Sequence, residues 1–121
     1  MTWDKWLDEK KFTLFRSSII QEQFIQCIID NTKPGGNILE AGFGFGTTTE
    51  LLRDLDYNIE GFDLEEVAVK KATERYPLLN NKLSVGNILD KESYSGFYDS
   101  IIHQGVLEHF SDEDILKILD I

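Results

Sequence analysis

The segment ILEAGFGFGTTTELL, residues 38–52, constrains the fold more than any other part of the sequence. An apolar run ends at Glu40, and Gly42, Gly44 and Gly46 then recur at every second position before a helical pattern begins. Glycine allows positive φ and lets the backbone approach a ligand, because no Cβ intervenes. A strand, a glycine loop and a helix in this order present free helix N–H groups at the carboxyl end of a strand, where open α/β sheets bind ligands.

The rest of the chain alternates between short apolar runs and helical patterns. Strands are expected over 37–41, 58–62, 82–87 and 99–105, and helices over 47–55, 64–76 and 112–121. Strands that alternate with helices of this length favour βαβ units. Right-handed crossovers then place helices on both faces of a mainly parallel sheet, so the predicted fold class is α/β.

The N-terminal region is expected to form helices over residues 1–31, since apolar side chains recur there at helical spacing. Trp3, Trp6 and Phe12 form an aromatic stripe that either packs on the domain or partly covers its ligand. The single cysteine, Cys27, is predicted to be a buried, unreactive thiol. A turn at 33–36 separates these N-terminal helices, residues 1–33, from an α/β domain over 34–121.

Three expected helix starts have the spacing of a capping box, namely Thr47 with Glu50, Asp63 with Glu66, and Ser111 with Asp114. Around the last of these, Phe110 and Ile115 occupy the positions of a hydrophobic staple.

The charge of the chain limits its partners. The formal net charge is -10, and no cluster of Lys or Arg is present, which disfavours nucleic acid and membrane headgroups. One cysteine excludes an intrachain disulfide and a cysteine metal cage, and we predict no metal site. The chain begins without the apolar core of a signal peptide and has no membrane-spanning run, so we expect a cytoplasmic protein.

The glycine spacing discriminates between nucleotide ligands. The dinucleotide fingerprint requires Gly or Ala at the position of Thr47, and the Lys-Ser/Thr pair of a phosphate-binding loop is absent. The sequence therefore disfavours NAD and ATP, while a plain turn without a ligand remains an alternative.

The pattern E-x-G-x-G-x-G after an apolar strand resembles motif I of the class I (Rossmann-like) S-adenosylmethionine-dependent methyltransferases. The resemblance implies that Gly42, Gly44 and Gly46 line the methionine part of the cofactor. It also implies that Glu40 lies beneath the cofactor, close to its ammonium group.

The likeness continues along the chain. It implies that Asp63 accepts hydrogen bonds from both ribose hydroxyls, although Asp63 can also act only as a helix cap, and that Leu64 packs on the adenine or ribose edge. Where the family usually has Gly-Asp, this chain has Asn87, whose carbonyl can accept from the adenine amino group without the gain of a charge. Ile88 is either an adenine wall or a core residue.

The run YDSIIHQGVLEHF, residues 98–110, is similar to the fourth-strand motif of small-molecule methyltransferases of this class. The resemblance implies that Gln104, Gly105 and Val106 end this strand beside the transferable methyl group. His103 and His109 are the titratable candidates for a general base, and structural roles are the alternative for both.

A complete domain of the class has about seven strands in the order 3-2-1-4-5-7-6, and residues 34–121 supply only the first four, so the predicted sheet is truncated after the fourth strand. The apolar fourth strand is then an open edge. We expect that edge and residues 115–121 to be covered in a homodimer or by a missing C-terminal half.

The leading hypothesis is therefore an S-adenosylmethionine-dependent methyltransferase domain with a small-molecule acceptor, whose activity in this chain alone is open. A non-catalytic binding or assembly module that acts through dimerisation is the alternative. A nucleotide-dependent oxidoreductase is the third possibility, which Thr47 disfavours.

Overall fold

The computed structural model describes residues 19–121, and the predicted aromatic stripe at Trp3, Trp6 and Phe12 lies outside this range. The chain divides into two compact units, Met1–Lys33 and Pro34–Ile121. No helix in the described part of the chain is both long and apolar enough to cross a membrane.

In the first unit, helix α3 spans Ile19–Asn31, which confirms the helical prediction for that segment. The prediction of a buried Cys27 is wrong, because the thiol is exposed. The neighbouring Ile28, about 100° further round the helix, takes the buried position with 5% of its surface exposed. Asn31 Nδ2 lies over this turn and donates to the carbonyl oxygen of Cys27 at 2.7 Å.

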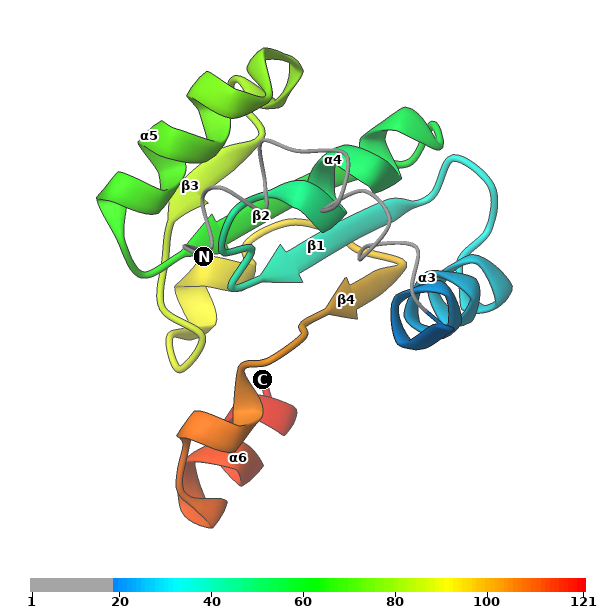
Figure 1. Cartoon of the computed structure of the whole chain (residues 1–121). Coiled ribbons are helices and arrows are strands. Elements are labelled where there is room, and N and C mark those ends of the chain that lie inside the picture. Colours follow the sequence, from blue (N-terminus) through cyan, green and yellow to red (C-terminus); the bar gives the residue numbers. More distant parts are fainter. Residues whose placement is uncertain (1–18) are drawn as a thin grey trace. The chain divides into compact units, whose positions relative to one another are not determined.

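The second unit contains a sheet of four parallel strands in the order β3-β2-β1-β4 (Figure 1). The strands are β1 Asn37–Ala41, β2 Asn58–Asp63, β3 Leu83–Val85 and β4 Ser100–Ile102. This order confirms the α/β, Rossmann-like fold and the strand order predicted for the first four strands.

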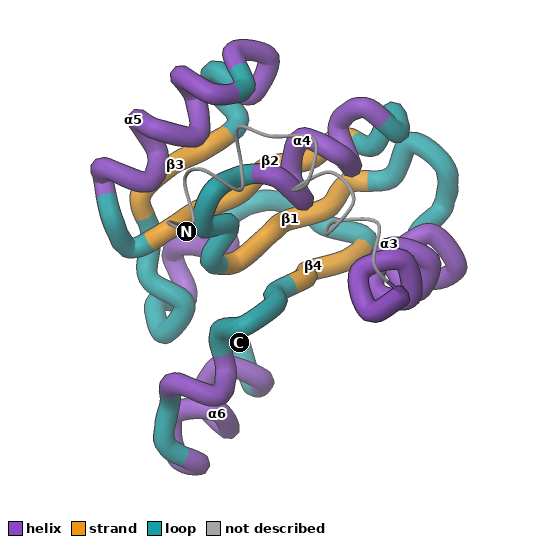
Figure 2. Tube along the Cα trace, in the orientation of Figure 1, coloured by secondary structure: helices purple, strands orange, loops and turns teal. Residues whose placement is uncertain are grey.

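Buried contacts lie on both faces of this sheet. On one face, the buried Glu40 of β1 accepts a hydrogen bond from Thr49 of α4, Thr47–Asp54. Leu39 and Ala41 alternate with Glu40 and so point to the opposite face, where they cluster with Ile118 of α6, Asp112–Leu119. The remaining helical segments are α5 Glu66–Arg75, η1 Pro77–Leu79, η2 Lys91–Tyr94 and η3 Leu107–His109. Figure 2 shows α4 and α5 alongside the strands and α6 beyond the end of β4.

Two strands are shorter than predicted because their neighbours turn away. Strand β4 pairs only with β1, up to Glu40 opposite Ile102, and β1 then bends at Gly42 with φ of 78°. His103 and Gln104 therefore lie beyond the strand. Strand β3 ends at Val85, opposite the last residue of β2, and the chain turns directly afterwards.

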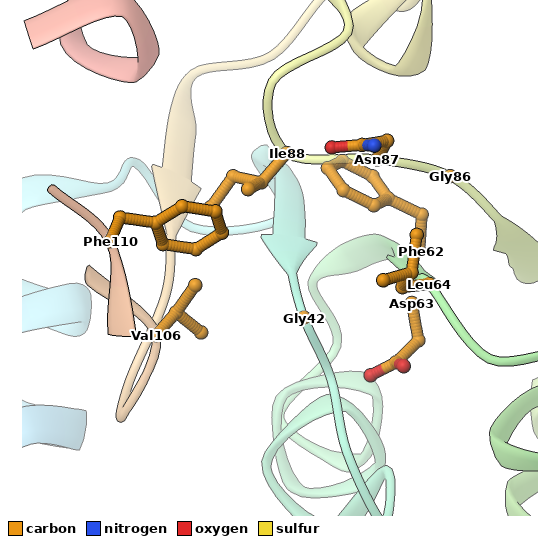
Figure 3. A pocket seen from close by; sticks show the side chains of 9 residues that line it. All are labelled: Gly42, Phe62, Asp63, Leu64, Gly86, Asn87, Ile88, Val106 and Phe110. Carbon is orange, nitrogen blue, oxygen red and sulfur yellow. The ribbon is translucent and has the colours of Figure 1, made fainter. Parts of the chain in front are cut away.

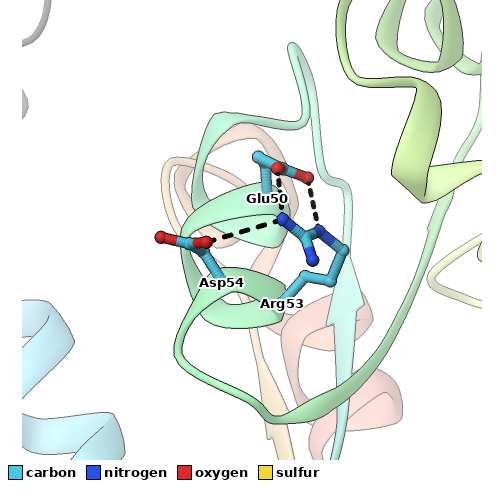
Figure 4. Close-up of polar contacts among 3 residues, drawn as sticks. All are labelled: Glu50, Arg53 and Asp54. Carbon is cyan, nitrogen blue, oxygen red and sulfur yellow. Dashed lines mark hydrogen bonds and ion pairs between the residues drawn. The ribbon is translucent and has the colours of Figure 1, made fainter.

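One of the three predicted helix caps is confirmed. Ser111 is the N-cap of α6, and its hydroxyl accepts from the Asp114 N–H at 3.2 Å. The cap predicted at Thr47 is wrong, because Gly46 is the N-cap of α4. Glu50, the partner predicted for Thr47, instead accepts two hydrogen bonds from Arg53 at 2.8 and 2.9 Å, and Asp54 lies beside the same guanidinium (Figure 4). These contacts raise the pKa of Arg53, mainly through the hydrogen bond to Glu50.

The third predicted cap, at Asp63, is also wrong. Helix α5 begins at Glu66 with Glu65 as its N-cap, two residues later than the prediction. The carboxylate of Asp63 is engaged instead by two backbone N–H groups near the carboxyl end of β2, one of which belongs to the glycine loop.

Candidate functional site

The glycine loop bends sharply at the end of β1. Gly42, Gly44 and Gly46 have φ of 78°, 59° and 81°, a region that side chains with a Cβ rarely adopt. The N–H groups of Gly42 and Phe43 both donate to the carbonyl oxygen of Phe62, at 2.8 and 3.3 Å. These two hydrogen bonds hold the loop against the carboxyl end of β2.

Helix α5 holds the loop from its other side. The guanidinium of Arg75 lies 5.4 Å from the ring centre of Phe45, and its Nη1 donates to the Phe45 carbonyl oxygen at 3.4 Å. A Cβ on Gly46 would lie 3.0 Å from the Cβ of Ala72. The close approach of α4 and α5 thus requires glycine at this position.

Asp63 is the acidic group at the end of β2. Its Oδ2 accepts from the Gly44 N–H at 3.0 Å, and its Oδ1 accepts from the Glu65 N–H at 3.2 Å. Each carboxylate oxygen has a second lone pair that remains available to an external hydroxyl. The two backbone bonds fix the direction of the carboxylate, which is partly exposed to solvent.

Glu40 occupies a different environment from that of Asp63. It is 3% exposed and accepts a short hydrogen bond of 2.5 Å from the hydroxyl of the fully buried Thr49. Its carboxylate therefore faces helix α4, on the opposite side of β1 from Leu39 and Ala41. The predicted contact of Glu40 with a cofactor ammonium group stays a prediction.

A pocket of ≈ 130 Å³ opens at the carboxyl ends of β1, β2 and β3 (Figure 3). The structure brings five of the predicted site residues together around it: Gly42, Asp63, Leu64, Asn87 and Ile88. The other predicted cofactor residues, Glu40, Gly44, Gly46 and Gln104, are not among those that line it. Gly44 nevertheless contacts a lining residue, because its N–H donates a hydrogen bond to Asp63.

Sequence reasoning missed the aromatic walls of this pocket. Phe62 and Phe110 line it together with Gly86 and Val106. The position of Phe62, directly before Asp63 at a strand end, was a usable signal. Phe110 was assigned only to a hydrophobic staple, because nothing in the sequence shows that the path after β4 returns over the loop.

Val106 lies directly over the glycine loop. A Cβ on Gly42 would come within 3.0 Å of its Cγ2.

The pocket is smaller than the roughly 300–1,000 Å³ of ordinary small-molecule sites. A neighbouring recess of ≈ 440 Å³ shares Phe62, Leu64, Gly86 and Asn87 with it and has a more polar lining that includes Ser93. The two spaces are therefore adjacent along the ends of β2 and β3.

The turn after β3 is held rigidly at the boundary of these two spaces. The Asn87 N–H donates to Ser93 Oγ at 2.9 Å, and the Tyr94 hydroxyl donates to the Ile88 carbonyl oxygen at 2.8 Å. The ring of Tyr94 meets that of Phe62 edge-on at 5.3 Å. Burial raises the pKa of Tyr94, so its hydroxyl keeps the proton that it donates.

Neither histidine lines the pocket. The side chain of His109 is 76% exposed, with Nε2 3.9 Å from the Glu108 carboxylate, and His103 is half-buried beyond the end of β4. A catalytic role for either stays a prediction. Among the described residues, no three His, Cys, Asp or Glu side chains form a group that could hold a metal ion.

Comparison with known proteins identifies the class. Residues 38–120 match the model of the methyltransferase domain family. The chain is 29% identical over 79 residues to a probable S-adenosylmethionine-dependent methyltransferase of Mycolicibacterium smegmatis, a match that covers 65% of this chain and 30% of that protein.

Solved structures share the fold. The PH0226 protein from Pyrococcus horikoshii OT3 superposes with a TM-score of 0.71 at 19% identity, over 93% of this chain and 51% of that one. PKMT2 from Rickettsia typhi, solved in complex with AdoHcy, gives a TM-score of 0.57 at 22% identity, over 72% of this chain and 18% of that one. The chain thus spans about a third of the curated relative and about half or less of these structures.

The chain belongs to the methyltransferase domain family, and its α/β unit shares the fold of the solved structures named above. These comparisons do not favour the alternative of a non-catalytic assembly module.

Proposed function

We propose that residues 34–121 bind S-adenosylmethionine in the crevice at the ends of β1, β2 and β3, as the methyl donor for a small-molecule acceptor. The observation that carries this proposal is the fixed carboxylate of Asp63 at the mouth of a largely apolar pocket. The chemistry of the lining fits a nucleoside: a carboxylate accepts from vicinal hydroxyls, and Phe62, Leu64 and Ile88 offer an apolar bed for a flat base.

The described residues that line the pocket include no basic side chain, and Thr47 stands where the dinucleotide fingerprint has Gly or Ala, so a dinucleotide is disfavoured. A sulfonium nucleoside carries no phosphate, and its positive charge suits an acidic chain. Within this proposal, Gly42 and Gly44 let the backbone approach the amino-acid part of the cofactor, and Asn87 and Ile88 border the base.

The methyl group is already activated on the cofactor when bound, so the protein mainly aligns the acceptor and excludes water. In the proposed site, Asp63 orients the sugar, and Val106 and Phe110 close the crevice on the side of β4. We assign Glu40 to positioning: its bond to Thr49 ties the end of β1 to α4 and so fixes where the glycine loop starts.

Calorimetric titration with S-adenosylhomocysteine, S-adenosylmethionine and NAD tests the proposal. We expect the first two to bind and NAD not to bind. Asp63→Ala should weaken binding of S-adenosylhomocysteine by roughly 1–3 kcal/mol, because hydrogen bonds to the sugar are lost. Glu66→Ala is the matched control, since it removes the same charge from the exposed first turn of α5 without changing the pocket.

Binding of NAD alone would contradict the proposal, and so would equal affinities of the Asp63 and Glu66 variants. The proposal also includes a small-molecule acceptor. It includes either a homodimer or a missing C-terminal half at the edge of β4. It further includes a cytoplasmic location without nucleic-acid or membrane partners. These parts rest on the family likeness, the exposed apolar residues of β4 and α6, and the net charge of -10.

A further inference from the structure

The N–H of Gly44 fixes the direction of the Asp63 carboxylate, yet packing does not hold Gly44 itself. It donates to Asp63 Oδ2 at 3.0 Å, its backbone is exposed, and a Cβ built on it would meet no atom beyond its chain neighbours within 4 Å. Glycine also has a wider range of φ and ψ than other residues. The position of this donor therefore depends on the two residues beside it, Phe43 and Phe45.

Phe43 is held by packing against β2. It is 5% exposed, and its N–H donates to the Phe62 carbonyl oxygen at 3.3 Å. A Cβ on Gly61 of β2 would lie 3.2 Å from the Cδ2 atom of Phe43, so the ring lies directly on the strand. Burial thus fixes this side of Gly44.

Phe45, on the other side of Gly44, is held by Arg75 at the end of α5. Phe45 is half-buried, and the guanidinium of Arg75 lies 5.4 Å from its ring centre, while Nη1 donates to its carbonyl oxygen at 3.4 Å. A guanidinium is planar and charged, so it can lie over a ring and donate to a carbonyl oxygen at the same time. Both of these contacts are with the residue next to the Gly44 donor.

Arg53 has the corresponding place in α4 but makes different contacts. Each of the two arginines is half-buried in the last turn of its helix, where a cation is favoured by the helix dipole. Arg53 pairs with Glu50 and Asp54 of its own helix, whereas Arg75 reaches a loop that begins a different helix. The contacts of Arg75 therefore do more than stabilise the end of α5.

We infer that Arg75 is a positioning residue for ligand binding: it holds Phe45, which keeps the Gly44 N–H in place to direct the carboxylate of Asp63. This inference rests on the proposed binding of S-adenosylmethionine at Asp63. Neither Arg75 nor Phe45 lines the pocket, so Arg75 acts on the ligand through the glycine loop.

A double-mutant cycle on the affinity for S-adenosylhomocysteine tests this inference. Arg75→Gln should weaken binding about five- to tenfold, because hydrogen bonds to a misaligned carboxylate contribute less. In the Asp63→Ala background, the same change should weaken binding less than about twofold, since the carboxylate that Arg75 positions is gone. Urea denaturation of each variant establishes that binding is measured on folded protein.

The amide proton of Gly44 gives a second readout by nuclear magnetic resonance. Its hydrogen bond to a carboxylate moves the signal downfield, so Asp63→Ala defines where the signal lies without that bond. Arg75→Gln should move the Gly44 signal towards the same position. Arg53→Gln is the matched control, because it removes a half-buried arginine from the last turn of α4, and it should leave the signal and the affinity unchanged.

The possible outcomes are distinct. The inference is overturned if Arg75→Gln leaves the affinity unchanged, weakens binding equally in both backgrounds, or leaves the Gly44 signal in place. It is also overturned if Arg53→Gln weakens binding as much as Arg75→Gln does. These outcomes leave the proposed function intact, whereas a natural chain that does not bind S-adenosylhomocysteine overturns the proposed function and this inference together.

Discussion

The two flanks of the pocket are built differently. On the flank of β1, α4 and β2, two hydrogen bonds hold the site: a buried one from Thr49 to Glu40 and an exposed one from Gly44 to Asp63. On the flank of β4 and α6, the strand has three residues and pairs on one side only. Large apolar side chains are exposed there, with Ile101 at 50%, Leu116 at 68% and Leu119 at 66%.

The difference teaches which part of the site this chain can organise alone. The contacts that hold the flank of β1, α4 and β2 come from neighbouring segments of the described residues. The flank of β4 and α6 contributes Val106 and Phe110 to the pocket, yet leaves apolar surface that a partner can cover. Substitutions in the flank of β1, α4 and β2 should thus mainly change the free energy of unfolding. Substitutions in the flank of β4 and α6 should also change how strongly the chain associates.

The largest expected effect is that of Gly46→Ala. This residue has φ of 81°, and a Cβ there would lie 3.0 Å from Ala72 Cβ and 3.6 Å from Leu79 Cδ1. Left-handed strain costs about 1–2 kcal/mol and overpacking adds a similar amount, so the free energy of unfolding should fall by about 2–4 kcal/mol. Urea denaturation measures this change.

Gly35→Ala separates the two causes. Gly35 has φ of 71°, but a Cβ there would meet no other atom within 4 Å, so only the strain of about 1–2 kcal/mol applies. If the two variants lost equal stability, the close packing of α5 against the glycine loop would not require glycine at position 46.

The next prediction separates the role of Glu40 in stability from the role of Asp63 in ligand binding. The two carboxylates lie at the ends of adjacent strands. Thr49→Val keeps the shape of a fully buried residue and removes the hydroxyl that donates to Glu40. We expect a loss of about 2 kcal/mol in the free energy of unfolding. At a temperature where the variant is folded, its affinity for S-adenosylhomocysteine should fall less than that of Asp63→Ala, because the pair fixes the start of the glycine loop but lies outside the pocket.

Thr47→Val is the control for this substitution, as its hydroxyl makes only a 3.4 Å contact with Tyr76. It should be nearly neutral in stability. A Thr49→Val variant that loses ligand affinity as strongly as Asp63→Ala would place Glu40 at the ligand and contradict its assignment as a positioning residue.

The same contrast explains how far the sequence could predict the fold. Alternating apolar runs and helical patterns predicted a parallel α/β sheet. The resemblance to class I methyltransferases implied the strand order, which the structure confirms as β3-β2-β1-β4. The ends of β3 and β4 could not be predicted, since each strand stops where its neighbour turns away. Helix starts failed at Thr47, where the bend of the loop places Gly46 at the N-cap, a tertiary effect.

The site was predictable where it lies at strand ends. Asp63, Leu64, Asn87 and Ile88 surround one pocket because the carboxyl ends of parallel strands share one edge of the sheet. The resemblance implied that Val106 lies near the ligand, and Val106 does line the pocket. The contribution of Phe110 depends on how residues 103–110 return over the loop, which no local pattern encodes.

The flank of β4 and α6 carries the prediction of self-association. We expect a dimer at tens of micromolar that buries the open edge of β4 together with Leu116 and Leu119. Leu116→Lys should weaken dimerisation at least about tenfold, because a charge replaces an apolar group worth roughly 1.5–3 kcal/mol when buried. Light scattering across a dilution series measures the association.

Leu78→Lys is the matched control, since Leu78 is equally exposed, at 66%, but lies in η1. It should leave the dimer unchanged. A natural chain that is monomeric across the series would contradict the prediction, and equal weakening by both lysine variants would move the interface away from α6.

The smallest expected effect compares the helix starts of the two flanks directly. Ser111 caps α6 through its hydroxyl, whereas α4 begins at Gly46 without any side-chain cap. Ser111→Ala should therefore lower the free energy of unfolding by about 0.5–1 kcal/mol, while Thr47→Ala, one residue inside α4, should cost less. Amide hydrogen exchange in the first turn of α6 gives a local measure of the same loss, because the Asp114 N–H loses its acceptor. If Thr47→Ala destabilised the protein more than Ser111→Ala, the start of α4 would depend on the threonine hydroxyl after all, and the glycine loop would not set where that helix begins.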